Sequence, residues 1–509
     1  MVATVIAGET TRDGASIQER ALRGVSALTQ LGVGEGDVVA IMLRNEPAFL
    51  ETMLIARLAG CYSCPINWHY KADEAGYILR DCGAKALFVH ADLLHQIESG
   101  IPDATNVIVV EPPESVRAAF RIAPEQCAVP PGRTEYEQWL AASAPYAGPP
   151  RQVHYSLPYS SGTTGRPKGI MRRPPQAEHA ARMLQITQLA LGIRQGMRTA
   201  IVAPLYHSAP ASYGMQSLLF GELALIHERF DAERLLADIE RHKLDRLYLV
   251  PTHFVRLLRL PDEVKRRHDL SSIKFIASTG SPCPPEIKRQ MIDWWGPVIN
   301  ESYASSEAGF ITALSSAEAL THPGSAGRPL LGSDVRIMSD SGDVLPPFEP
   351  GLIYCRQSAY PDFTYINRPD DRRAIDRDGL VAVGDVGYFD RDGYLYICDR
   401  KSDMVISGGV NIYPAEIEAV LITMPGVADC AVFGIPDAEF GEALAAHVQP
   451  HNGTPLEREA VRTFLKERIA DYKVPRVVEF SDALPREESG KIFKRRLRDP
   501  YWQDAGRRI

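Results

Sequence analysis

Apolar residues in the first ninety positions follow two alternating spacings. A serine–glutamate pair at 16–19 fits a helix-capping box, and apolar residues then recur at helical spacing until Gly32. An apolar run at 37–43 predicts a buried strand, residues 47–58 a helix and residues 86–89 another strand. Such alternation is typical of helices layered on mostly parallel sheets and predicts an α/β fold.

The later part of the chain keeps this pattern and then changes. Runs at 244–250 and 273–277 predict further buried strands, and the proline- and glycine-rich stretch 130–150 predicts a surface connection. After Val381 comes a hairpin turn signal at 390–394.

A short charged segment then precedes about a hundred residues with a strand–helix pattern of their own. We therefore predict a domain boundary at 400–403, which separates an N-terminal domain (1–399) from a C-terminal domain (404–509).

Composition narrows the class of protein. A chain of 509 residues with 45% hydrophobic content is too long for one core, so at least two domains are expected. The net charge of −8 gives no general basic field for nucleic acid. The first nine residues lack the pattern of a signal peptide, and no apolar run has membrane-spanning length. These features predict a cytoplasmic protein without a transmembrane segment.

Eight cysteines are scattered along the chain, and only Cys61 and Cys64 form a C-x-x-C pair. A redox pair or half of a zinc site remains open, but no second pair lies near. Buried thiols on an apolar segment are the favoured interpretation.

The stretch from Tyr159 to Gly169 carries the strongest chemical signal. Glycines let backbone N–H groups approach a ligand, and successive N–H groups form an anion-binding nest. Hydroxyls add donors and a lysine adds a charge, so the loop suits a polyphosphate. It is not a Walker loop, because Pro167 stands five residues after Gly162. An ordinary surface turn is the alternative. The candidate phosphate-binding residues are Ser160, Ser161, Gly162, Thr163, Thr164, Gly165 and Lys168.

This string resembles the phosphate loop of the adenylate-forming superfamily, which includes acyl-CoA synthetases, aryl-CoA ligases, luciferases and peptide-synthetase adenylation domains. Further motifs follow in family order along nearly the whole chain. The resemblance implies a large N-terminal α/β domain of several subdomains and a small, mobile α+β C-terminal domain. The two would be joined by a hinge, and acyl-CoA synthetases are the nearest branch.

Motifs in the N-terminal domain imply an acid pocket and a nucleotide site. The segment 204–208 resembles the motif whose histidine, here His207, borders the carboxylate and is implied to be catalytic. The implied acid-pocket residues are His207, Ser208, Ala209, Ser212, Thr279 and Ala304. The turn 278–282 resembles the adenine-side turn, with Gly280 and Ser281 nearest the base. By itself that string would predict only a turn.

The segment 300–307 resembles a Tyr-Gly-x-Thr-Glu motif. The resemblance implies that Tyr303 stacks on adenine, Ser306 contacts phosphate and Glu307 binds Mg²⁺ and is catalytic. Two residues depart from the motif, because Ala304 replaces glycine and Ser306 replaces threonine.

Two further residues complete the implied nucleotide site. Asp385 matches the aspartate that accepts from both ribose hydroxyls, with Val383 where threonine is common. Arg400 matches the arginine that reaches ribose or phosphate. The alternative for the Gly-Asp pair at 384–385 is a simple turn.

In the C-terminal domain, Gly408 and Gly409 match the glycine loop that lines the pantetheine tunnel of relatives. Lys491 matches the catalytic lysine, and the alternative is that it only begins a basic run. That run comprises Lys494, Arg495, Arg496 and Arg498.

Phe440 and Tyr472 fall where relatives hold aromatic residues against the CoA nucleotide. The nearby Val474 lacks the charge that some relatives carry there. Ser402 stands at the implied hinge, where relatives place Asp or Lys.

The resemblance implies a two-step ligase. A carboxylic acid and ATP, with Mg²⁺, would give acyl-AMP and pyrophosphate. After domain rotation, CoA would give the thioester and AMP. The acid is expected to be aromatic or a medium-to-long acyl chain. The oligomeric state does not follow from the sequence, and a homodimer stays open.

Other functions within the superfamily remain to be weighed. A peptide-synthetase domain would need an aspartate near His207, and the run 208–213 has none; no carrier-domain serine motif is seen either. A luciferase-like oxidase and an amide-forming enzyme share the motifs. A catalytically dead binding protein would be expected to lose Lys491 or Glu307, and both residues are present.

Overall fold

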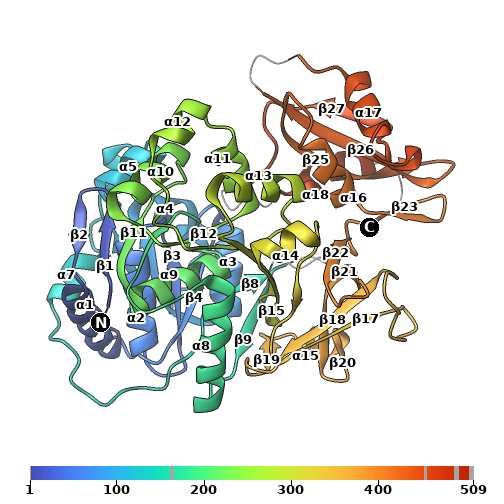
Figure 1. The fold of residues 1–509 in the computed structure, drawn as a ribbon. Helices are drawn as coiled ribbons and strands as arrows, with labels where there is room; N and C mark the ends of the chain where they lie inside the picture. The colour runs from blue at the N-terminus through green and yellow to red at the C-terminus, as the bar shows by residue number, and fades with distance from the viewer. Residues whose placement is uncertain (1, 161–165, 452–454, 487–491, 504–509) are drawn as a thin grey trace.

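The computed structural model describes residues 2–160, 166–451, 455–486 and 492–503. Two large, mostly parallel sheets are built from the blue-to-yellow part of the chain, with helices packed on their faces (Figure 1). These layers confirm the α/β fold. Within the described residues, no helix is both long and apolar enough to cross a membrane.

The first sheet has nine strands, of which β1, β10, β11, β12, β13 and β14 pair in parallel. Its spatial order is β16 (Arg328–Pro329), β15 (Gly309–Leu314), β14 (Ile299–Ser305), β13 (Phe275–Ser278), β12 (Arg246–Leu249), β10 (Met197–Ile201), β11 (Gly221–Ile226), β1 (Thr4–Ala7) and β2 (Thr10–Arg12). The second sheet has the order β4 (Tyr62–Pro65), β3 (Val38–Met42), β5 (Ala84–His90), β6 (Asn106–Val110) and β7 (Thr134–Glu135).

The helices of this part of the chain are α1 (Gly14–Gln30), α2 (Pro47–Leu58), α3 (Ala72–Asp81), α4 (Ala91–Ile97), α5 (Glu114–Phe120), α6 (Pro124–Cys127), α7 (Tyr136–Ala141), α8 (Ala177–Leu191), α9 (Ser208–Phe220), α10 (Ala232–His242), α11 (Pro251–Leu258), α12 (Asp262–Arg267), α13 (Pro285–Trp295), α14 (Ser316–Thr321) and α15 (Pro369–Ala374).

The predicted elements at 37–43, 47–58 and 86–89 are confirmed as β3, α2 and part of β5. The runs at 244–250 and 273–277 are confirmed as β12 and β13, each beginning two residues later than predicted.

Two predictions in this region are wrong. The capping serine at 16 lies inside α1, because the Asp13 carboxylate accepts from the Ser16 N–H at 2.8 Å and starts the helix earlier. The stretch 130–150 is not only a surface connection. It contains α7, whose Tyr136, Trp139 and Leu140 are buried in the core beneath α1 and α2.

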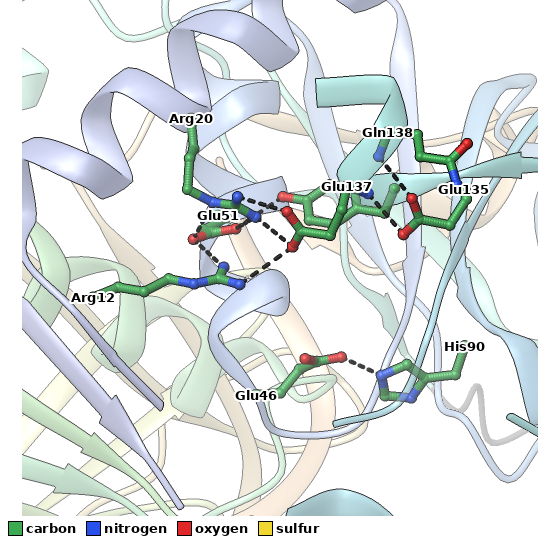
Figure 2. A network of polar contacts seen from close by, with 9 residues as sticks. Arg12, Arg20, Glu46, Glu51, His90, Glu135, Glu137 and Gln138 are labelled. Carbon is green, nitrogen blue, oxygen red and sulfur yellow. Dashed lines mark hydrogen bonds and ion pairs between the residues drawn. The ribbon is translucent and has the colours of Figure 1, made fainter. Parts of the chain in front are cut away.

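A buried network of ion pairs and hydrogen bonds joins the three helices α1, α2 and α7 (Figure 2). Glu51 of α2 is 1% exposed and accepts from Arg12 at 2.5 Å and from Arg20 at 3.1 Å. The Tyr136 hydroxyl of α7 donates to Glu51 at 3.0 Å, and Glu137 binds Arg20 at 2.7 Å. Polar groups at this depth are stable because each carboxylate oxygen has a donor.

Two smaller sheets contain the orange strands, and one of them also includes the teal strands β8 and β9 (Figure 1). One has the path β17 (Ser333–Met338), β18 (Gly351–Gln357), β21 (Leu380–Phe389) and β20 (Asp376–Arg377), with β22 (Leu395–Arg400) on β21. The antiparallel pair β21–β22 confirms the predicted hairpin turn at 390–394. The other has the order β19 (Phe363–Tyr365), β9 (Lys168–Arg172) and β8 (Tyr159–Ser160).

The residues after Asp403 build their own sheet around their own core. The path is β24 (Val410–Ile412), β23 (Val405–Ser407), β26 (Gly441–Pro450) and β25 (Val427–Asp437), with β27 (Val477–Phe480) on β26. The helices are α16 (Pro414–Leu421), α17 (Arg458–Lys466) and α18 (Lys494–Trp502). A cluster that includes Ile417, Leu421, Val448 and Leu465 forms this core. Far from it, Cys61 and Cys64 are buried free thiols, which confirms the structural interpretation of that pair.

Candidate active site

The candidate site lies at one edge of the nine-stranded sheet. Strands β10, β12, β13 and β14 pair in parallel, so their carboxyl ends meet at the same edge. The predicted motifs 204–208, 278–282 and 300–307 follow or end β10, β13 and β14. Ligands of α/β sheets bind at such edges.

Two of these motifs touch each other. The Ser208 hydroxyl lies 3.3 Å from the Ser306 hydroxyl, which joins the start of α9 to the segment after β14. His207 is the N-cap residue of α9, and its ring packs against Tyr206 at 4.3 Å between centroids.

The predicted acid-pocket residues line this part of the sheet. Ala209 and Ala304 pack against the cluster that contains Tyr213 and Tyr248. Thr279 is buried directly after β13, and Ser212 is half-buried in α9.

A polar triad of Tyr303, Asp385 and Arg400 lies beside this edge. The Tyr303 hydroxyl donates to Asp385 Oδ2 at 2.6 Å, and Arg400 Nε lies 2.7 Å from Oδ1. Burial raises the pKa of Tyr303, and the Asp385 carboxylate raises it further. The phenol therefore stays protonated and acts as a donor.

Backbone register explains how two of these residues meet. Asp385 in β21 stands directly opposite Arg400 in β22, so the antiparallel ladder fixes the ion pair. Arg400 Nη1 also donates to the Val383 carbonyl at 3.1 Å. Asp385 therefore lies within a strand, which rules out the simple-turn alternative for this pair.

Glu307 is held by residues that the sequence analysis missed. The Tyr365 hydroxyl donates to Glu307 Oε1 at 3.0 Å. Buried Arg172 donates to the carbonyls of Ser306 at 2.9 Å and Glu307 at 2.5 Å, and burial lowers its pKa. Strand alternation puts Lys168 and Arg172 on one face of β9, which is the signal that could have found Arg172.

Of the candidate phosphate-binding residues, the structure describes only Ser160 and Lys168, at the two ends of the series. Ser160 pairs with Lys168 in the β8–β9 ladder, so the two described ends of the motif lie side by side. Ser161, Gly162, Thr163, Thr164 and Gly165 lie outside the described residues. Lys168 Nζ lies 2.9 Å from Asp371 and 5.1 Å from the Tyr365 ring centroid. The hydrogen bond from Lys168 lowers the pKa of Asp371.

The predicted adenine-side segment bends away directly after β13. Gly280 has a φ of +98°, a conformation that side chains other than glycine rarely adopt. Gly280 and Ser281 are both exposed at the end of β13. Their backbone groups are therefore accessible to a ligand at this edge.

In the C-terminal part, Gly408 and Gly409 form the turn between β23 and β24. Their φ values are +57° and +82°. The Gly408 N–H donates to the Phe440 carbonyl at 2.9 Å, so these three predicted CoA residues lie together. Tyr472 is 57% exposed in a separate short helix at 471–473.

Arg476 is a further candidate that the sequence analysis missed. Its guanidinium lies 4.7 Å from the Phe440 ring centroid, and its Nη1 lies 2.7 Å from Asp437. It supplies a cation two residues after Val474, whose lack of charge the sequence analysis noted. A positive charge two positions past Val474 was the available signal.

The predicted hinge contacts both parts of the chain. Exposed Ser402 accepts from Arg498 of α18 at 3.5 Å through its carbonyl. Its neighbour Lys401 binds Asp340 at 2.9 Å. Asp399 accepts from the Ala415 N–H at the start of α16 at 2.9 Å. Arg259, just after α11, also donates to the carbonyls of Val427 and Ala428, so these four contacts all hold the C-terminal part in its present pose.

Lys491 lies outside the described residues, but both flanks of its segment are anchored. Arg486 binds Asp429 through two nitrogens at 2.5 and 2.7 Å. Lys494 lies 2.8 Å from Glu418. Burial alone would lower the pKa of Lys494, but Glu418 and Asp399 raise it. Lys494 is therefore a paired side chain and not part of a solvated basic face.

Comparison with protein families decides the identity of this arrangement. Residues 3–360 match the model described as AMP-binding enzyme, and residues 416–491 match the AMP-binding enzyme C-terminal domain. The chain belongs to the AMP-binding enzyme family. This places the edge of the nine-stranded sheet in an adenylate-forming enzyme.

Individual relatives cover almost the whole chain. A feruloyl-CoA synthase from Amycolatopsis sp. is 33% identical over 96% of this chain and 94% of its own length. The o-succinylbenzoate CoA synthetase from Bacillus subtilis, solved with its acyl-adenylate intermediate, is 28% identical with a TM-score of 0.78 over 97% of this chain and 95% of the other. An amide bond synthetase from Marinactinospora thermotolerans is 25% identical with a TM-score of 0.80 over 98% and 97%.

Proposed function

We propose that this AMP-forming acid–thiol ligase activates an aromatic carboxylic acid and transfers it to CoA. ATP and the acid give acyl-AMP and pyrophosphate, and CoA then gives the thioester and AMP. The observation that carries the proposal is the Tyr303–Asp385–Arg400 triad at the edge where the acid-pocket motifs also meet.

Each member of the nucleotide site has a role in this proposal. Asp385 accepts from the ribose hydroxyls, since a carboxylate has about four lone-pair sites and the two protein donors leave capacity. Arg400 stays half-exposed and reaches the ribose or the α-phosphate. The Tyr303 ring stacks on adenine, while Gly280 and Ser281 contact the base through their backbone.

Phosphate and metal contacts fall to neighbouring residues. Ser306 and Lys168, with the segment 161–165, bind phosphate oxygens. Glu307 fits Mg²⁺, because a hard cation prefers carboxylate oxygens and one Tyr365 contact leaves coordination sites. Bound there, Mg²⁺ would neutralise phosphate charge. Arg172 fixes the backbone of Glu307 and thereby orients its carboxylate.

The two half-reactions divide between two domain poses. Lys491 bridges the substrate carboxylate and the α-phosphate in the first step. The C-terminal domain then turns about 400–403, with Ser402 at the pivot, because hinges are short element-terminal segments. The turn requires the Asp399–Ala415 and Lys401–Asp340 contacts to break or re-form.

CoA is the proposed acceptor. In this proposal Gly408 and Gly409 line the path of pantetheine and His207 borders the reacting carboxylate. The Phe440 ring and the Arg476 guanidinium, which stack on each other, form a surface for the nucleotide. Tyr472 is a second aromatic residue for it. An amide-forming reaction is the second candidate, since one structural relative is an amide bond synthetase. A luciferase-like oxidase is a third.

An aromatic acid is proposed for two reasons. The cluster that includes Ala209 and Ala304 contains Tyr213, Tyr248 and Phe310. The relatives described above are named for feruloyl and o-succinylbenzoate thioesters. We also propose that the enzyme works in the cytoplasm, where ATP and CoA are available.

A substrate screen tests this function. The full chain is incubated with ATP, Mg²⁺ and sets of aromatic, medium-chain and long-chain acids. AMP release is measured with CoA, with an amine in place of CoA, and with neither acceptor. Aromatic acids should give CoA-dependent AMP and a thioester. AMP release that depends on an amine, with no thioester, would replace the proposal with the amide-forming reaction.

A further inference from the structure

An arginine of the N-terminal domain contacts the C-terminal domain at a point away from the predicted hinge. Arg259 follows α11 directly, and its Nη2 atom donates to the carbonyls of Val427 at 3.3 Å and Ala428 at 2.5 Å. The other contacts between the domains that are described above involve residues 399–402. The pose of the C-terminal domain is therefore held both at its hinge and at this second point.

The residues that Arg259 contacts begin β25, and the same end of this strand anchors the lysine-bearing segment. Asp429, the next residue, accepts from Arg486 through both of its carboxylate oxygens, at 2.5 and 2.7 Å. The backbones of Arg486 and Ile492 pair in an antiparallel bridge. The two described flanks of the segment 487–491 are thus held together beside the residues that Arg259 contacts.

The glycine turn at 408–409 lies at the opposite end of β25. Asp437, the last residue of β25, pairs with Gly441 of β26, and Gly441 also pairs with Ser407 beside the glycine turn. Eight positions separate Asp429 from Asp437, which is about 26 Å by strand rise. The anchor of the lysine-bearing segment and the glycine turn are therefore far apart on one rigid strand.

The two ends of β25 face different surroundings. The end that begins at Val427 contacts Arg259, whereas Ile406 and Val410, on either side of the glycine turn, are 49% and 46% exposed. Figure 1 shows β23 on the side of this domain away from α11. The present pose therefore presents the anchors of the Lys491 segment, and not the glycine turn, to the N-terminal domain, as the first half-reaction requires.

We propose that Arg259 is a positioning residue that stabilises the pose of the first half-reaction and releases the C-terminal domain for the second. Its Nη2 atom carries two N–H groups, so one guanidinium nitrogen can bind both carbonyl oxygens. Arg259 does not act on the reacting atoms. It stands eight residues after the start of α11 at Pro251, or about 12 Å by helix rise from the strand end that precedes this helix. This inference rests on the proposed function.

The ratio of the two half-reaction rates measures this role. When each half-reaction proceeds from its own pose, its rate is proportional to the population of that pose, so the ratio of the rates follows the equilibrium between the poses. A contact made in one pose alone shifts this ratio by its full free energy. One net hydrogen bond of about 1.4 kcal/mol gives a tenfold shift. A folding defect lowers both rates together and leaves the ratio unchanged.

The test compares full-chain wild type with three variants of Arg259. Acid-dependent ATP–pyrophosphate exchange and thioester formation from presynthesised acyl-AMP and CoA are measured on the same preparation. Ferulate and its adenylate are the first probe, and the aromatic acid that gives the most AMP in the screen above replaces them if ferulate is not activated. Arg259→Ala should lower the ratio of exchange to thioester formation about tenfold.

The other two variants grade the effect. Arg259→Glu should lower the ratio further than Arg259→Ala, because its carboxylate would face two carbonyl oxygens and the nearby Asp429. Arg259→Lys should restore part of the wild-type ratio, because its ammonium group still donates hydrogen bonds. A residue that only supports folding would not produce this order.

Arg267→Ala is the matched control. Arg267 ends α12, and its Nη1 atom lies 3.0 Å from Glu233 of the same domain. The substitution removes an arginine with its ion pair from a neighbouring helix and should keep the wild-type ratio. A shift as large as that of Arg259→Ala would show that the ratio responds to any lost surface arginine, and the role of Arg259 would be overturned.

The outcomes separate this inference from the function on which it rests. Folded Arg259→Ala and Arg259→Glu variants with the wild-type ratio, or with a raised ratio, overturn the role of Arg259 and leave the ligase standing. Circular dichroism establishes that the variants are folded. If no acid gives CoA-dependent AMP with the wild type, the proposed function fails and the inference fails with it.

Discussion

Glu51 and Asp385 are both buried carboxylates bound by arginine and tyrosine. They differ in how many hydrogen-bond donors the protein supplies to each carboxylate. Glu51 receives Arg12 and Arg20 on one oxygen and Arg20 and Tyr136 on the other (Figure 2). Within the described residues, Asp385 receives one side-chain donor on each oxygen, and the side chain of Arg400 is 51% exposed. The same donor types therefore make a closed network in one place and an accessible one in the other.

We propose that this difference separates a structural carboxylate, Glu51, from a functional one, Asp385. The closed network lies among α1, α2 and α7 and holds the first region together. The open one lies beside the strand ends where a ligand can enter. Neither residue type nor burial distinguishes the two sites, whereas remaining acceptor capacity and position do.

The largest effect is expected at Glu51. Glu51→Gln keeps the shape but leaves two guanidinium groups without their buried charge, and the free energy of unfolding should fall by about 3–5 kcal/mol. The kcat/KM of the folded fraction should not change. Urea denaturation and active-site titration measure both quantities. A Glu51→Gln variant with a reduced kcat/KM for ATP and an unchanged free energy of unfolding would identify Glu51 as a functional residue and contradict the comparison.

The reverse result is expected at Asp385. Asp385→Asn should lower kcat/KM for ATP by about 10- to 150-fold, because a charge-assisted hydrogen bond contributes about 1.5–3 kcal/mol. Stability should change little. Exposed Asp334, which pairs with Arg336, supplies the control Asp334→Asn, which should keep wild-type kinetics. A stability loss as large as that of Glu51→Gln would show that Asp385 is structural.

His253 offers a smaller, pH-dependent effect. Burial, with a contribution from Arg256, lowers the pKa of this fully buried side chain to about 3. An unfolded histidine has a pKa of about 6.5, so below that pH the unfolded chain binds a proton that the folded chain does not. Stability should therefore fall by about 2 kcal/mol from pH 7 to pH 5 through this residue.

The His253→Phe variant isolates this term, since it keeps an aromatic ring stacked on Phe230. Its unfolding free energy should lose about 2 kcal/mol less than that of the wild type between the two pH values. Exposed His95→Gln is the control and should keep the wild-type slope. If the free energy of unfolding changes equally with pH in all three proteins, the assignment of this pH dependence to His253 is contradicted.

Elements with a strong local pattern could be predicted from the sequence. The buried run of β3 and the proline-started α2 have the bounds or nearly the bounds that their residues indicate. Helix α1 was predicted with the wrong cap because two residues, Asp13 and Ser16, could each fill that role. Helix α7 was missed because proline and glycine on both sides hide its three buried side chains.

The residues of the candidate site could be predicted only from the family motifs. Tyr303 and Asp385 are 82 positions apart, and no spacing rule predicts their 2.6 Å hydrogen bond. Arg172 and Arg476 act through backbone carbonyls and a ring face, which leave no motif in the sequence. Long-range pairs of this kind depend on strand register and packing.

The central claim is that this one site catalyses two half-reactions and that Lys491 serves only the first. The most direct test compares wild type and Lys491→Ala in acid-dependent ATP–pyrophosphate exchange and, separately, in thioester formation from presynthesised acyl-AMP and CoA. Exchange should fall by about two to three decades, because one oriented charge contributes about 3–4 kcal/mol. Thioester formation should remain near the wild-type rate. An equal loss of both reactions, or exchange that survives the substitution, would contradict the account.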